Sequence, residues 1–531
     1  MSRTLFVAAA LWLGLMVIYQ LDDMVVEEGD AIPNVEVATT LLQTGALHFT
    51  PRSAPVVFFW QSEAPLEARD DFYVRTWHER HQGKAAGIWY ATGQLHVNGP
   101  RYFAVKSPVR EAYLSTFGPV PGLTLLPLAA VLEVINSNLT HRAPLKLAAA
   151  KLHASMLVAS SAVFVLLIGL RYVRLRYALL VAIVYGLGTC VWAIASRTLW
   201  QQTVSIALIM AAIYAWLRTL EAPKQRPAPL ACGLLLGTAM AGRPTALFFA
   251  LALLWPLWQR RESLAERGAM QRMVAGMLPP LLAIAAYNDY YFGSPLHFGQ
   301  EIIGHSIAFA KTGQNKLWQT PIVIGVTGLL FSPSRGLVIF SPCLALGFWG
   351  AVKVWQDAKY ALLRPLTLAA GLTMLLQSKW FDWWGGWVYG YRPWLEAVPI
   401  LALCLLPVIE QVFARTAPAR IFMAALAWSI FVQGLGAFSY DKFWNERILF
   451  AVKEHNGQRR FFARETDARA ESAGKSAEYQ GEFHCNIDFP ECRYRLWSFD
   501  DNIISYYWHE RYDIAREHRM HMPWRQLLGG R

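Results

Sequence analysis

Charged residues are scarce in this chain of 531 residues: they make up 16%, whereas 55% of the residues are hydrophobic and 13% are aromatic. An ordinary soluble domain carries roughly 25% charged residues. The shortage of charge therefore excludes that class, and the long apolar runs predict a membrane protein. Runs apolar enough, and most nearly long enough, to cross a hydrocarbon core of about 30 Å include Thr4–Gln20, Ala149–Leu170, Tyr177–Ser196 and Thr203–Leu217.

Several motifs are also absent. The chain has no GxxxxGK(S/T) phosphate loop, no pair of CxxC motifs, no HExxH and no internal repeat or low-complexity tract. These absences argue against a P-loop nucleotide hydrolase, a zinc protein and a repeat array. The net charge of +12 does not indicate nucleic-acid binding, because basic cytoplasmic loops that meet anionic lipid account for much of it.

Basic residues in short connections favour the cytoplasmic side of a membrane. Such connections lie at 171–176, 218–226, 260–272, 353–364 and 415–420. Alternation then places 288–333, 379–394 and everything after Tyr440 outside, and requires 122–135 to be a juxtamembrane or re-entrant helix. The first apolar run lacks a convincing cleavage site and is interpreted as a retained anchor. We expect an all-α polytopic membrane protein with about eleven transmembrane helices.

Two sizeable polar regions face outward in this topology. Residues 21–148 form a long first outward loop with juxtamembrane helices, and residues 439–531 form a small α+β domain. The chain is therefore divided into a transmembrane domain, 1–438, and a C-terminal domain, 439–531. Of the six cysteines, Cys485 and Cys492 alone lie away from apolar runs, so a disulfide between them is predicted in an oxidising compartment, with two unpaired thiols as the alternative.

Acidic residues follow the first apolar run at Asp22, Asp23, Glu27, Glu28 and Asp30. We interpret Asp22 and Asp23 as solvated boundary residues. Asp30 lies between a glycine and an Ala-Ile-Pro turn that precedes a helix-like run, so its carboxylate could be held in one place and act as a base. No metal site is predicted with certainty, although Glu27, Glu28 and Asp30 could bind a divalent cation.

The stretch GDAIPNVEVATTLLQTGALHF, beginning at Gly29, resembles the first outward loop of the GT-C glycosyltransferases. These polytopic enzymes transfer a sugar from a polyprenyl-phosphate carrier to an acceptor. The resemblance implies that 1–438 is a catalytic domain and that Asp30 is the catalytic base, with Glu28 in reserve. Six further stretches are similar to the superfamily in the same order: FGPVPGLTLLP (117–127), SRTLWQQT (196–203), GLLLGTAMAGRPTAL (233–247), YNDYYFGSPLHFG (287–299), GLLFSPSRGLVIFSP (328–342) and WFDWWGGWVYGYRPWLEAVP (380–399).

A phosphate leaving group requires fixed cations, and arginine can grip two oxygens at once. Arg335 in SPSRGL and Arg392 in YGYRPW are the predicted carrier-phosphate contacts. Interfacial snorkelling is the alternative for both. The resemblance suggests the same contact for Lys106, although 106–115 separates it from the Pro-Gly step that commonly follows closely. Arg243 and Lys379 are weaker candidates.

The segment 379–394 contains five tryptophans. Trp383 and Trp384 precede two glycines and, with Tyr391, are predicted to form a platform for a sugar ring or an isoprenoid unit. Trp and Tyr also gather at membrane interfaces regardless of function, which is the alternative for the other three tryptophans.

Three functions remain open. The first is an inverting glycosyltransferase that uses a polyprenyl-phosphate-linked sugar, acts on a glycan, lipid or protein acceptor, and faces the periplasm from a bacterial inner membrane. The second is a transferase of a whole glycan from a polyprenyl-diphosphate carrier. The third is a lipid or solute transporter, which the absence of repeated halves disfavours. Lys151 and His153, charged or polar groups near the start of an apolar run, are explained by snorkelling or headgroup contact.

Overall fold

The structure is a computed structural model. It describes residues 3–26, 29–50, 53–54, 57, 103–136, 138–221, 227–454, 457, 459–462, 465–474, 477–509 and 520–528.

The described chain is mostly helical, and six of its helices are long and apolar enough to cross a membrane. They are α1 (Arg3–Gln20), α6 (Ala143–Gly169), α8 (Gln201–Glu221), α11 (Leu264–Phe292), α16 (Arg364–Ser378, continuing the short helix from Ala358) and α19 (Thr416–Ser439). Shorter apolar helices are α5 (Val120–Ile135), α7 (Leu175–Leu187), α9 (Pro227–Gly242), α10 (Leu247–Gln259) and α13 (Ile322–Phe331). The count of about eleven spans stays a prediction.

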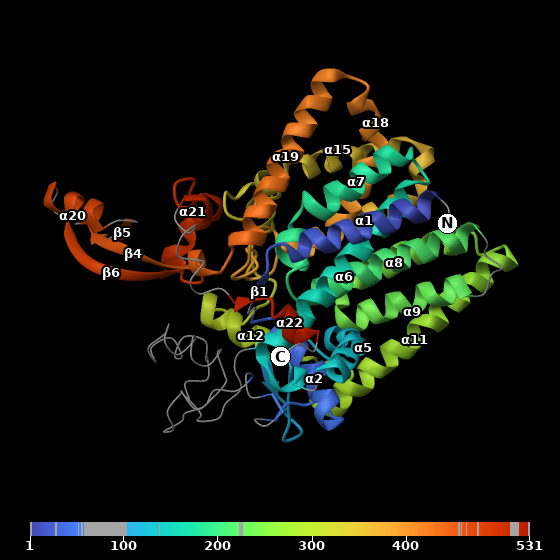
Figure 1. Cartoon of the computed structure of the whole chain (residues 1–531), viewed down its shortest axis with the longest axis horizontal. Coiled ribbons are helices and arrows are strands. Elements are labelled where there is room, and N and C mark those ends of the chain that lie inside the picture. The colour runs from blue at the N-terminus through green and yellow to red at the C-terminus, as the bar shows by residue number, and fades with distance from the viewer. Residues whose placement is uncertain are drawn as a thin grey trace.

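Helices α6, α8, α9 and α11 lie side by side in the helical body (Figure 1). The approach of α9 to α11 depends on glycine: a Cβ on Gly233 would lie 1.9 Å from the Met273 carbonyl oxygen, and one on Gly237 would lie 2.6 Å from that of Met277. These two glycines form a GxxxG pattern, which allows the backbones of apolar helices to pack closely.

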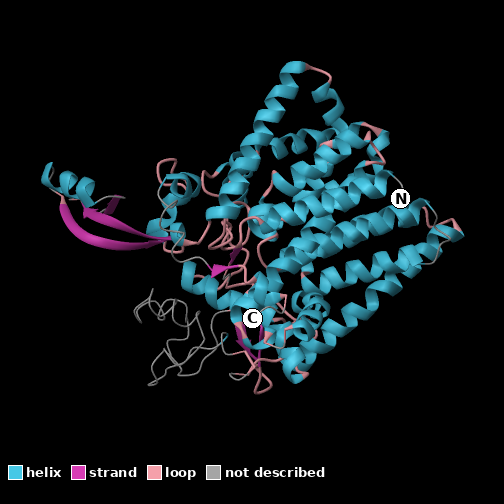
Figure 2. Cartoon of the chain, viewed as in Figure 1, coloured by secondary structure: helices cyan, strands magenta, loops and turns pink. Residues whose placement is uncertain are grey.

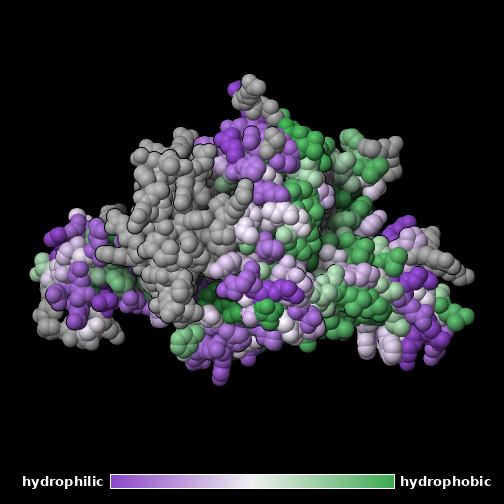
Figure 3. Space-filling view, turned by 90° about the horizontal axis from the view of Figure 1, so that it is seen from below, coloured by the Kyte–Doolittle hydropathy of each residue, from purple (hydrophilic) through white to green (hydrophobic). Residues whose placement is uncertain are grey.

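Apolar side chains are also exposed on the outer faces of these helices. Examples are Leu5 and Val17 on α1, Leu282 on α11 and Ile421 on α19. Figure 3 shows green hydrophobic side chains gathered over the helical body, with purple hydrophilic ones toward either end. An apolar surface of this extent is unusual for a soluble monomer and indicates a membrane protein.

The first polar region contains α2 (Ile32–Thr44), a hairpin of β2 (Ala104–Lys106) and β3 (Tyr113–Ser115), and α5. Helices α2 and α5 pack closely because Gly122 has no side chain: a Cβ there would lie 2.5 Å from the Asn34 carbonyl oxygen. The region is fastened to α6 by an ion pair between Lys146 and Glu36 at 2.8 Å.

The interpretation of Asp22 as a solvated residue is wrong. Asp22 is buried and pairs with Lys151, whose side chain is fully buried on α6, and Arg197 lies 3.6 Å from the same carboxylate. The snorkelling explanation of Lys151 is therefore also wrong, because a buried ammonium group is retained by its partners. Asp23 is exposed, as expected, and lies 3.2 Å from His521.

The C-terminal region contains both strands and helices, as predicted. An antiparallel sheet of order β5 (Arg459–Phe462), β4 (Glu446–Lys453), β6 (Glu478–Asn486) projects from the helical body together with α20 (Glu465–Gly474), as Figure 2 shows. Cys485 and Cys492 form a disulfide at the base of this sheet. Beyond it, α21 (Ile503–His509) joins the main hydrophobic core through Ile503 and Tyr507.

The segment after α1 meets the C-terminal end of the described chain. Strand β7 (Met520–His521) pairs antiparallel with β1 (Met24–Val25), and α22 (Trp524–Leu527) follows it. Met522 and Leu527 are buried in the same hydrophobic cluster as Val35 and Val37 of α2. Residues near the C-terminal end of the described chain therefore stabilise the loop that carries Asp30.

Candidate functional site

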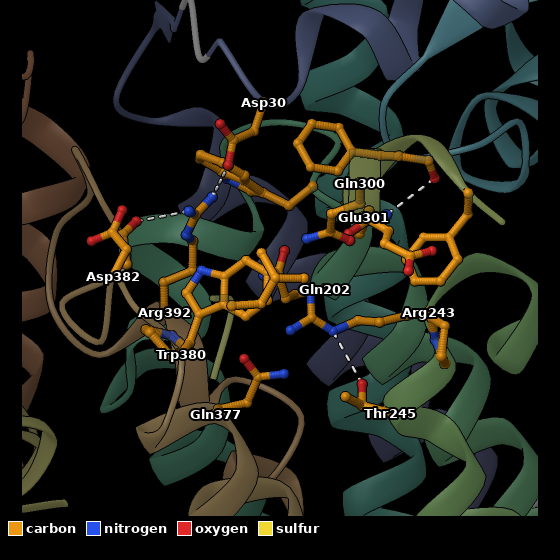
Figure 4. A pocket seen from close by; sticks show the side chains of 18 of the residues that line it. Asp30, Gln202, Arg243, Thr245, Gln300, Glu301, Gln377, Trp380, Asp382 and Arg392 are labelled. Carbon is orange, nitrogen blue, oxygen red and sulfur yellow. Dashed lines mark hydrogen bonds and ion pairs between the residues drawn. The ribbon is translucent and has the colours of Figure 1, made fainter. Parts of the chain in front are cut away.

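A cavity of about 360 Å³ lies where several loops meet the helical body. Its walls come from the turn before α2, the first turn of α8, the turn between α9 and α10, the start of α12 (Gly299–Thr312) and segment 379–394. Figure 4 shows Asp30, Arg243, Glu301, Asp382 and Arg392 facing this cavity from these separate elements.

Asp30 is held one residue before the N-cap of α2. The helix begins at Ile32 because Pro33 favours the first helical turn. Asn34, fully buried, donates from its side-chain amide to the Leu199 carbonyl at 2.9 Å and to the Asp30 carbonyl at 3.3 Å. This contact fixes the Asp30 backbone against the start of α8, so the carboxylate has a defined place in the cavity wall.

Arg392 forms an ion pair with Asp30. Its second terminal nitrogen donates to the Gly385 carbonyl at 2.7 Å, and its guanidinium lies 4.4 Å from the centre of the Trp200 ring. The side chains of Arg392 and Asp30 are 14% and 21% exposed, so both charges remain accessible from the cavity.

Arg243 supplies a second cation to the cavity, from the turn between α9 and α10. Its Nε lies 3.1 Å from the carboxylate of Glu396, which is fully buried. Thr245 donates to that carboxylate at 2.7 Å, and Ser205 donates to it at 2.5 Å. Because Glu396 is fixed from three sides, it also fixes the guanidinium of Arg243.

The remaining cavity wall is divided between amide and apolar groups. Gln201, Gln202 and Gln377 supply side-chain amides. Trp200, Trp318 and Trp380 line the cavity as well, and amphipathic rings of this kind suit a ligand with both polar and apolar parts. The cavity is therefore amphipathic.

The backbone of segment 379–394 depends on two glycines. Gly385 and Gly386 have φ values of +78° and +73°, a region that other residues rarely adopt. The Asp382 carboxylate accepts a hydrogen bond from the Gly386 N–H at 3.0 Å. The resulting turn presents the Gly385 carbonyl to Arg392.

Arg335 lies away from the cavity wall and is fully buried. Its guanidinium donates to the carbonyls of Ser334, Trp384 and Gly386 and to the side chain of Asn445, at 2.8 to 3.2 Å. Burial lowers the pKa of Arg335 to about 10. In this structure the arginine holds segment 379–394 in place from behind, and its own side chain does not line the cavity.

Lys106, Trp383, Trp384 and Tyr391 are also outside the cavity wall. Lys106 is half exposed and pairs with Glu111 at 3.0 Å, which raises its pKa. Trp383 and Trp384 are buried, and Tyr391 is fully buried, donating to Ser341 at 2.6 Å. The aromatic rings that do line the cavity are those of Trp200, Trp318 and Trp380.

A metal site remains a prediction. Glu27 and Glu28 lie outside the described residues, whereas the Asp30 carboxylate is paired with Arg392. Among the described residues, no group of three His, Cys, Asp or Glu side chains could hold a metal ion.

Fold and site together define a class: a multi-pass helical protein whose amphipathic cavity contains an Asp–Arg pair and a second, fixed arginine. No family model and no curated protein matches the chain. Trp200, Gln202 and Trp318 line the cavity without having been predicted as site residues. Trp200 and Gln202 belong to SRTLWQQT, a polar segment between two apolar runs. This position is the sequence feature that could have indicated that they line a site.

Proposed function

We propose that the protein is an inverting glycosyltransferase that moves a sugar from a polyprenyl-phosphate carrier to an acceptor hydroxyl at the outer face of a bacterial inner membrane. The observation that carries the proposal is the contact between Asp30 and Arg392 at the cavity wall. It brings a proton acceptor and a phosphate-binding group to one place, although 362 residues separate them in sequence.

The reaction needs one displacement. The acceptor hydroxyl attacks the anomeric carbon, its proton passes to the Asp30 carboxylate, and the bond between that carbon and the phosphate oxygen breaks. The carrier phosphate leaves with the electron pair, and Arg392 and Arg243 stabilise the charge on its oxygens. Because the acceptor attacks opposite the leaving group, the configuration at the anomeric carbon is inverted.

The Asp30–Arg392 pair links the availability of Asp30 to binding of the donor. While the guanidinium holds the carboxylate, an Asp30 oxygen is occupied by a hydrogen bond from Arg392 and is less available to the acceptor hydroxyl. A carrier phosphate competes for the same guanidinium. Binding of the donor therefore frees Asp30 for the acceptor hydroxyl, so the base becomes effective when the donor is in place.

Exposed apolar side chains at the cavity favour a donor with a hydrophobic carrier. Leu296, Phe298 and Trp318 line the cavity, yet they are 82%, 36% and 41% exposed. They lie between α11 and α13, whose outer faces carry exposed Leu282 and Val323. An isoprenoid chain could leave the cavity over this apolar mouth and reach the hydrocarbon core.

The test is incubation of detergent-purified protein with a panel of polyprenyl-phosphate sugars, with mass spectrometry of freed carrier. Asp30→Asn should abolish carrier release, because the amide cannot accept the proton, while carrier binding persists. Asp23→Asn is the matched control: it removes the same charge from an exposed residue on the same loop and should retain turnover. Equal turnover by Asp30→Asn and wild type would refute Asp30 as the base.

Two other outcomes would redirect the assignment. Consumption of lipid-diphosphate oligosaccharide, with no use of lipid-phosphate monosaccharide, would favour transfer of a whole glycan. Movement of substrate across sealed vesicles without a covalent product would favour a transporter.

A further inference from the structure

Three buried charged side chains and a partly buried arginine form a group at and behind the cavity wall. Lys311, at the end of α12, places its Nζ 2.7 Å from the Asp382 carboxylate and 2.8 Å from the Asp488 carboxylate. The three side chains are 6% to 11% exposed. One ammonium group therefore joins two carboxylates that lie 106 residues apart in the sequence.

Arg493 completes the group. It donates to the backbone carbonyls of Lys311 and Asp488, at 2.7 and 3.0 Å, and its guanidinium lies 4.8 Å from the Trp384 ring centre. Two cations and two anions give formal neutrality, which a buried ionic group needs. Burial raises the pKa of Asp488 and Asp382 raises it further, although Lys311 opposes this shift.

Each anion belongs to a different part of the molecule. Asp488 lies in the loop that the Cys485–Cys492 disulfide closes. Asp382 lines the cavity, and its other carboxylate oxygen accepts from the Gly386 N–H. The neighbouring Gly385 carbonyl accepts from Arg392. A continuous series of contacts thus runs from the disulfide loop to the cavity arginine.

We propose that Lys311 is a positioning residue through which the C-terminal domain sets the conformation of the cavity wall at 382–392. With Lys311 in place, Asp382 holds the Gly385–Gly386 turn, and the turn holds Arg392. Without it, Asp382 loses the ammonium group that contacts its carboxylate, and the turn loosens. The proposal concerns the construction of the cavity and holds whichever ligand the cavity binds.

Hydrogen exchange of the purified full chain in detergent tests the proposal without requiring turnover. In Lys311→Met, amides of 382–392 should exchange roughly tenfold faster, as expected for local loosening, whereas peptides from α6 and α8 should be unchanged. Lys311→Arg keeps the charge and should restore protection. Lys316→Met removes an exposed lysine from the following loop and is the control that should match wild type.

A charge-balanced variant distinguishes the positioning role of Lys311 from its contribution to the charge balance of the buried group. Lys311→Met/Asp488→Asn leaves Arg493 with Asp382 and restores formal neutrality, so its thermal midpoint should recover toward wild type while exchange at 382–392 stays fast. Wild-type exchange in Lys311→Met, or protection regained in the double variant, would overturn the proposal. If Lys311→Met does not fold, the double variant decides by the same criterion.

Discussion

At the residue scale, Arg392 and Arg335 differ in what surrounds their guanidinium groups. Arg335 is fully buried, and three backbone carbonyls and an Asn side chain accept its hydrogen bonds. Arg392 has one carbonyl acceptor and one carboxylate and faces the cavity. A guanidinium that protein acceptors already satisfy has little capacity for a phosphate. We therefore expect Arg335 to have a structural role and Arg392 to be available to a ligand.

Arg335→Lys should destabilise the protein by about 3 kcal/mol, because an ammonium group cannot reach all four acceptors and leaves buried carbonyls unpaired. The measurement is the thermal midpoint in detergent. Arg392→Lys, at a partly exposed site, should change the midpoint much less. Wild-type stability in Arg335→Lys combined with loss of carrier binding would return Arg335 to a phosphate role.

The sequence could not distinguish these arginines, since both lie at span boundaries beside glycine or proline. Which backbone carbonyls surround each one depends on tertiary packing between segments far apart in the chain. The same reason explains Lys151, whose partner Asp22 precedes it by 129 residues. Asp30 was easier to single out because the nearby Ala-Ile-Pro turn is a local signal.

At the element scale, segment 379–394 is held by close packing against helices. Trp383 lies against α13 at Gly328, where a Cβ would approach the indole ring to 2.3 Å. Tyr389 packs in the same way on α19, where a Cβ on Gly436 would lie 2.3 Å from its ring. These aromatic side chains fasten the loop to the helices, which explains their burial. An aromatic cluster in sequence does not reveal which rings face inward.

Gly328→Ala should destabilise the protein by about 1–3 kcal/mol, because the added methyl group overpacks the contact with Trp383. Gly371→Ala on α16 is the control, since nothing lies within 4 Å of its added Cβ and alanine favours the helix by about 1 kcal/mol. The two thermal midpoints should therefore move in opposite directions. A Gly328→Ala protein as stable as the Gly371→Ala protein would show that Trp383 does not anchor the loop.

At the scale of the whole molecule, α12 and the C-terminal sheet lie on the same side of the helical body (Figure 1). The start of α12 also lines the cavity. The charge rule predicts that the basic connection at 353–364 lies on the cytoplasmic side. Composition predicted the apolar helices and the polar regions between them. It could not give the span count, because several apolar helices are too short to decide by length alone.

Thiol labelling tests the orientation. Ala473→Cys in α20 and Ala358→Cys in the basic connection each introduce an exposed cysteine. The background is low, because Cys190, Cys232, Cys343 and Cys404 are buried and the other two are disulfide-bonded. In spheroplasts an impermeant maleimide should label Ala473→Cys and leave Ala358→Cys unmodified until the membrane is permeabilised. The reverse pattern would place the cavity in the cytoplasm.

The pairing of β7 with β1 has a consequence for biosynthesis. Met24 and Val25 leave the ribosome early, but their strand partners, Met520 and His521, follow almost five hundred residues later. Until those partners arrive, the edge beside the Asp30 loop is unpaired, and contacts of such long sequence separation form slowly. The loop that carries Asp30 therefore gains this strand pairing only after the helices between the two strands have been synthesised.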